Sequence, residues 1–122
     1  MIIIFEKNGK LNFVDSNNRF VGYDYHDQCC EEFGYYFSKI PGNVDEDHRI
    51  HQRDEDLIDF VFDSNYESKD SNDSAEEYFV SFRLFNSKNE TLYLTLFNHH
   101  NGYYSHEFDF GISDKVESKG EL

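Results

Sequence analysis

Residues 76–112, EEYFVSFRLFNSKNETLYLTLFNHHNGYYSHEFDFGI, decide the fold that the sequence predicts. They contain three runs rich in aromatic and β-branched residues, at 76–86, 90–98 and 103–112, and such runs are typical of strands. The dipeptide Asn101-Gly102 between the last two runs readily accepts the positive backbone angles of a tight hairpin turn. We therefore predict an antiparallel meander of three strands.

Apolar and polar side chains alternate along these three runs. One parity is apolar and comprises Tyr78, Val80, Phe82, Leu84, Leu92, Leu94, Leu96, Tyr104, Phe108 and Phe110. The other parity is polar and comprises Ser81, Arg83, Thr95, Ser105, Glu107 and Asp109. Because successive side chains of a strand point to opposite faces, we expect a sheet with one apolar face and one wet face. His106 interrupts the apolar parity.

Towards the N-terminus, the periodicity changes. Residues 2–5 predict a short strand, and residues 10–14 and 19–25 flank a turn-forming DSNN and predict a hairpin. Residues 26–42, HDQCCEEFGYYFSKIPG, have apolar residues at spacings of three and four and end at Pro41, so they predict a helix. Gly34 lowers the helix propensity of this segment.

The central part of the chain has few apolar positions. Residues 57–63 favour a strand, and residues 64–75, SNYESKDSNDSA, are typical of a mobile surface loop. We therefore expect a single α+β domain over residues 1–122, with an acidic, loop-rich insertion around 43–77. Its antiparallel sheet would have five to seven strands, with one helix packed on its apolar face.

Charge is the strongest compositional feature of this 122-residue chain, whose net charge is −14. Residues 45–77 contain 13 acids and three bases, a net charge of −10. Such a surface repels nucleic acid and anionic lipid, so we expect neither direct nucleic-acid binding nor membrane binding. A protein with a basic surface becomes the expected partner, and the oligomeric state stays open.

These observations predict a small acidic inhibitor that covers the nucleic-acid-binding surface of a host defence protein, as an anti-CRISPR or anti-restriction factor does. An immunity protein against a nuclease toxin is the alternative, and acidity that serves only solubility is a third interpretation. Tyr103 and Tyr104 could add an aromatic contact. The predicted partner-binding residues are Asp45, Glu46, Asp47, Asp54, Glu55, Asp56, Tyr103 and Tyr104.

His106 and the two cysteines are the candidates for chemistry. We expect His106 to be a core histidine with a hydrogen-bond partner supplied by Asp24 or Tyr23, in preference to a general base. A histidine-activated thiolate of Cys29 or Cys30 defines the less favoured enzyme hypothesis. No familiar catalytic motif is present, so we predict a protein that is not an enzyme.

Metal and cofactor sites are also weakly indicated. A zinc site would have to combine His26, Cys29 and Cys30 with His99, His100 or His106, but the sequence has no C-x-x-C pair. The acidic segment lacks the glycine and the bidentate Glu of a calcium-binding loop. We therefore predict no metal and no cofactor.

The adjacent cysteines cannot staple distant parts of the fold, and they favour a reduced, intracellular protein. The apolar run at the N-terminus is too short for a signal peptide or a membrane span. We therefore expect a cytoplasmic protein, located in the host cytoplasm if a phage encodes it.

Three motifs support a resemblance: FVGYD at residues 20–24, CCE at residues 29–31 and HNGYYSH at residues 100–106. Together they resemble an uncharacterised family of short phage and bacterial proteins. The resemblance implies a phage or mobile-element context and no particular activity. It also suggests that the second predicted strand pair, the start of the predicted helix and the last predicted hairpin meet in space.

Overall fold

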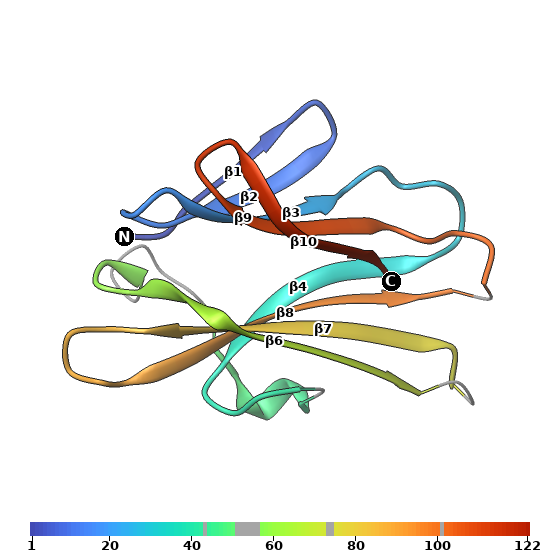
Figure 1. Cartoon of the computed structure of the whole chain (residues 1–122). Coiled ribbons are helices and arrows are strands. Elements are labelled where there is room, and N and C mark those ends of the chain that lie inside the picture. Colours follow the sequence, from blue (N-terminus) through green and yellow to red (C-terminus); the bar gives the residue numbers. More distant parts are fainter. Residues whose placement is uncertain (43, 51–56, 73–74, 101) are drawn as a thin grey trace.

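The computed structural model describes residues 1–42, 44–50, 57–72, 75–100 and 102–122. The chain forms two five-stranded antiparallel sheets that lie one above the other (Figure 1). The first sheet, in spatial order, consists of β1 (Ile3–Lys7), β2 (Lys10–Val14), β3 (Arg19–Asp24), β9 (Glu107–Ile112) and β10 (Lys115–Glu121). The second consists of β5 (Arg49–Ile50), β4 (Glu32–Ser38), β8 (Thr91–His99), β7 (Glu77–Phe85) and β6 (Val61–Asn72). A short 3-10 helix, η1 (Glu46–His48), precedes β5.

The predicted α+β class is wrong, because the described residues are 61% strand and 4% helical. The predicted helix at 26–42 is instead a connection followed by β4. Both faces of β4 are covered: Phe37 points into the core, whereas Tyr36 is buried on the opposite face. A strand that is buried on both faces loses its simple alternation, and its apolar spacing can imitate a helix. No helix in the described part of the chain is long and apolar enough to cross a membrane.

The prediction of a three-stranded meander is also wrong for its third strand. β7 pairs with β8 as expected, but β9 pairs with β3 and β10 in the first sheet. The connection that contains Gly102 therefore crosses from one sheet to the other, although Gly102 does adopt a positive φ of 92°. The segment 64–75, expected to be a loop, lies largely in β6, which extends to Asn72.

The core lies between the two sheets and confirms much of the predicted apolar parity. Phe82 and Leu94 of the predicted apolar parity are fully buried, and they lie in one core with Phe13 of the first sheet. Ser81 and Thr95, which were predicted to lie on a wet face, are buried as well, so the prediction of a wet face is wrong at these positions. Aromatic rings pack across the interface between the sheets, with the ring centroids of Phe82 and Phe110 4.9 Å apart. The aromatic content of the chain is therefore concentrated where it stabilises the pairing of the sheets.

A buried carboxylate also joins the two sheets. One oxygen of Asp15 accepts hydrogen bonds from the backbone N–H groups of Asn17 and Arg19, both at 2.9 Å, in the turn between β2 and β3. The other oxygen accepts the N–H of Phe62 in β6, also at 2.9 Å. Asp15 is 4% exposed, so these bonds replace the water that its charge would otherwise bind.

Candidate functional site

The acidic segment before β5 carries three of the six predicted partner-binding carboxylates. Asp45 precedes η1, and Glu46 and Asp47 lie within it. All three residues are exposed, and no cation in the described parts of the chain forms an ion pair with them. The other three predicted carboxylates, Asp54, Glu55 and Asp56, lie outside the described residues.

Tyr36 of β4 fixes the chain that leads into η1 against the outer face of the second sheet. Its hydroxyl donates to the carbonyl oxygen of Gly42 at 2.9 Å and accepts the N–H of Val44 at 3.4 Å. The Arg49 guanidinium lies 4.2 Å from the centre of the Tyr36 ring, which is a cation–π contact. Burial raises the pKa of the Tyr36 hydroxyl, so it remains a donor. The η1 carboxylates are therefore presented from an anchored backbone.

The two predicted aromatic contacts lie elsewhere. Tyr103 is 80% exposed, and Tyr104 is half-buried. Both belong to the connection between β8 and β9, at the right-hand end of the molecule in Figure 1, whereas η1 lies at its lower edge. The structure therefore does not bring Tyr103 and Tyr104 together with the η1 carboxylates.

His106 is fully buried where the end of β3, the segment before β4 and the segment before β9 meet. Its Nδ1 lies 2.6 Å from the carbonyl oxygen of Asp24, and its Nε2 lies 2.7 Å from Oε2 of Glu31. The Phe33 ring stacks on the imidazole at a centroid distance of 4.2 Å. The prediction of a core histidine with bonded partners is confirmed. Its partners are the main chain of Asp24 and the side chain of Glu31.

Glu31 is an ionised carboxylate despite its burial. Burial opposes the charged form, but hydrogen bonds from the N–H of Cys29, from His106 and from the N–H of Gln28 outweigh it and lower the pKa of Glu31 to about 2. The carbonyl of Asp24 and the carboxylate of Glu31 can only accept hydrogen bonds. Both ring nitrogens of His106 therefore face hydrogen-bond acceptors in a site that water does not reach.

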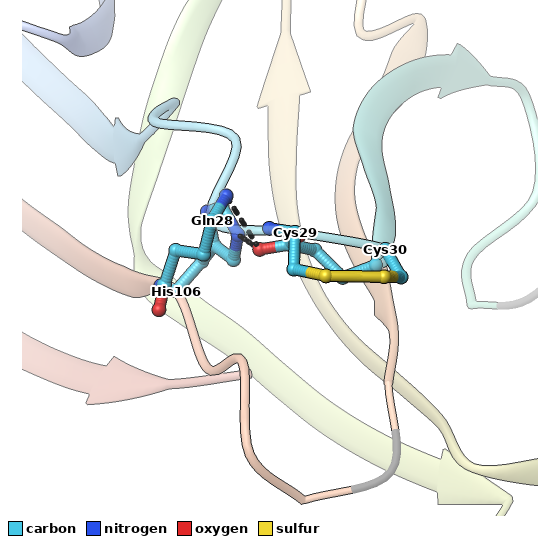
Figure 2. Close-up of a disulfide and its surroundings, with 5 residues drawn as sticks. Gln28, Cys29, Cys30 and His106 are labelled. Carbon is cyan, nitrogen blue, oxygen red and sulfur yellow. Dashed lines mark hydrogen bonds and ion pairs between the residues drawn. A yellow bond between two sulfur atoms is a disulfide. The ribbon is translucent and has the colours of Figure 1, made fainter.

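Cys29 and Cys30, immediately before this carboxylate, form a disulfide between adjacent residues (Figure 2). The expectation of reduced cysteines is therefore wrong for this structure, since the described residues include no free cysteine. Both residues are exposed in a bend of the chain. The enzyme hypothesis required a thiolate beside an available imidazole, whereas here the sulfurs are bonded to each other and both nitrogens of His106 are occupied.

His99 and His100 contact different partners. The ring nitrogens of His99 lie 3.9 Å from Glu32 and 4.0 Å from Glu77, and Nδ1 of His100 accepts the N–H of Gly102 at 2.9 Å. Within the described residues, no three side chains of the His, Cys, Asp or Glu type converge to hold a metal ion.

A family model described as "Domain of unknown function (DUF7448)" matches residues 2–110. The chain belongs to the DUF7448 family. Searches among curated proteins and among solved structures found no match. The matched range includes the three motifs at residues 20–24, 29–31 and 100–106, and the description of the family assigns no activity.

In this DUF7448 chain, the three motif segments do meet in space, as the sequence suggested. Each contributes one partner to the buried cluster: Asp24, Glu31 and His106. Glu31 itself was missed, because the sequence offers many paired acids and does not distinguish buried Glu31 from exposed Glu32. The sequence feature that could have pointed to Glu31 is His106 itself, because a buried histidine needs a carboxylate or carbonyl partner.

Proposed function

We propose that this DUF7448 protein is an acidic interaction protein that binds a basic, nucleic-acid-binding surface of another protein and thereby excludes nucleic acid. An inhibitor of a host defence protein, encoded by a phage, is the setting that best fits the motif resemblance. The observation that carries the proposal is the exposure of the η1 carboxylates on a chain with a net charge of −14.

Two features of the segment support this proposal. Asp45, Glu46 and Asp47 have no described cation to neutralise them, so their field is available to a partner. Their backbone is anchored by Tyr36 and Arg49, which reduces the ordering cost of binding. Carboxylates on an anchored backbone can occupy positions that phosphates would take on a basic partner.

Charge reversal with a matched control tests the proposal. The test variant carries Asp45→Lys, Glu46→Lys and Asp47→Lys. The control carries Asp27→Lys, Glu32→Lys and Asp114→Lys, three exposed acids outside the acidic segment, so both variants change the net charge equally. Each is used as bait in a bacterial lysate, at low and high salt and with competing duplex DNA.

The parent protein and the control should retain a nucleic-acid-binding protein that salt or duplex DNA releases, and the test variant should lose it. Both variants should melt within a few degrees of the parent, because exposed charge changes usually alter stability by less than about 0.5 kcal/mol each. The proposal fails if the parent retains no such protein, or if the control loses it as completely as the test variant. If the captured protein is a nuclease toxin, the function is immunity.

A further inference from the structure

The outer face of the first sheet, which points away from the core, consists of three rows of side chains that run across all five strands. Strand register places residues that share a row directly beside one another. The first row is Ile3, Val14, Phe20, Gly111 and Val116. The second row is Phe5, Asn12, Gly22, Asp109 and Lys119. The third row consists of Lys7, Lys10 and Asp24, which are paired across β1, β2 and β3, and of Glu107 and Glu121, which are paired across β9 and β10 at the same end of the sheet.

The first row is an apolar stripe that is accessible to solvent. Ile3 is 56% exposed and Val116 is 46% exposed, and Phe5 of the second row is 42% exposed beside them. Two hollows open on this face, one lined partly by Phe5 and Phe20 and the other partly by Lys119. An exposed apolar stripe bordered by polar residues is typical of an interaction surface.

The charges on this face are nearly balanced, unlike those of the whole chain. Its three rows contain three lysines and four acids, a net charge of −1, whereas the chain carries −14. The third row is also ordered by sign. Lys7 and Lys10 lie on β1 and β2, whereas Asp24, Glu107 and Glu121 lie on β3, β9 and β10.

We propose that this face is the interface of a homodimer, in which two copies pack the outer faces of their first sheets together around a two-fold axis parallel to the strands and over β3. Such an axis places β1 over β10 of the second copy and β2 over β9. The two-fold rotation keeps each row opposite itself. The apolar row therefore meets the apolar row, and Lys7 at one end of the third row meets Glu121 at the other end.

The distribution of apolar and charged side chains on this face favours a second copy of the chain over other partners. An isologous interface requires one surface that is complementary to itself, and a row ordered from positive to negative has that property under this axis. Lys7 then faces Glu121 of the second copy. Lys10 is bound to Asp109 of its own chain, and Asp24 lies near the axis opposite Asp24 of the second copy, so Lys7 and Glu121 are the charge pair that this axis creates. An anionic surface such as nucleic acid or lipid would meet four acids and three lysines on this face, and Lys10 is already bound to Asp109, so the face has no excess of positive charge to attract it.

The first experiment measures association of the full chain by sedimentation equilibrium over a wide concentration range. A dimer of the 14.5 kDa chain is expected. Ile3→Lys puts a charge into the apolar row of both copies, and it should raise the dimer Kd by roughly tenfold or more. Ile40→Lys is the matched control, since Ile40 is 46% exposed but follows β4 in the second sheet, and it should leave the Kd unchanged.

A charge exchange tests the orientation of the two copies. Lys7→Glu and Glu121→Lys should each weaken the dimer, and the double variant should restore it, because each Lys7 faces Glu121 of the second copy. Both residues are exposed, so these substitutions should leave the fold intact, as circular dichroism would verify. A chain that stays monomeric at every concentration overturns the proposal. A dimer that Ile40→Lys weakens as much as Ile3→Lys, or that the double variant does not restore, also overturns it.

Discussion

Replacing Glu31 with Gln removes the negative charge that faces the buried ring of His106. Gln keeps the size of Glu and one carbonyl oxygen, which can still accept the N–H of Cys29. It turns the second oxygen into an N–H donor, which then meets the donating Nε2 of His106, now 2.7 Å from Glu31. The variant must either leave buried donors unpaired or turn the ring of His106 away from its present partners.

Both outcomes reduce the free energy of unfolding. Both side chains are 0% exposed, so water cannot replace the lost partner. Losing a buried hydrogen bond to a charged group and leaving its donor unsatisfied costs about 2–3 kcal/mol. For a chain of this size, such a loss corresponds to a fall in Tm of roughly 10 °C. Glu32→Gln is the control, since the Glu32 side chain is 78% exposed, and it should change stability by less than about 0.5 kcal/mol.

The pH dependence identifies the ionised carboxylate. The folded pKa of Glu31, about 2, lies below its ordinary value of 4.5, so its contribution to stability is complete above pH 4.5 and is lost as the pH falls toward 2. Urea unfolding followed by circular dichroism suits a chain without Trp. The difference in stability between the parent and Glu31→Gln should shrink between pH 5 and pH 2. A difference that stays constant over this range would refute an ionised Glu31 in the fold.

Three further substitutions test other contacts. Asp15→Ala removes the acceptor of three backbone N–H groups, including that of Phe62 in the other sheet, and should cost on the order of 3 kcal/mol in urea unfolding. Tyr36→Phe removes the bonds to Gly42 and Val44, so it should cost about 1 kcal/mol and speed amide hydrogen exchange around η1, measured by mass spectrometry. Gly102→Val forces a β-branched residue to a φ of 92° and should lower the Tm by several degrees, while a Tm equal to the parent's would contradict the need for this backbone angle.

The sequence predicted local features of the fold better than its long-range pairing. The alternation at 76–98 correctly identified β7 and β8, and DSNN correctly marked the turn between β2 and β3. The segment around Gly102 carries a correct local signal, a positive φ, but such a signal does not state which sheet the next strand joins. β10 was not expected, because its sequence, KVESKGE, is that of a polar strand at the edge of a sheet.

The candidate site was predictable to the same limited extent. An interrupted apolar parity correctly indicated that His106 is buried and needs partners. Its actual partners are a main-chain carbonyl and Glu31, and a main-chain group leaves no residue-specific signal in a sequence. Glu31 was placed at the start of a helix that does not form, so its distance to His106 could not be inferred before β4 was recognised as a strand.

The proposed dimer and the proposed acidic interaction surface are compatible because they use opposite faces of the sandwich. Packing through the first sheets leaves the outer faces of the two second sheets pointing away from each other, separated by three sheet spacings of about 10 Å each. That separation is several times the Debye length, which is about 8 Å at physiological salt. The two acidic segments therefore repel each other only weakly. Each dimer would then present two acidic surfaces to an array of partner molecules. Lys7→Glu should therefore weaken binding to a densely immobilised partner, where two contacts form at once, and leave the affinity for a single partner molecule in solution unchanged.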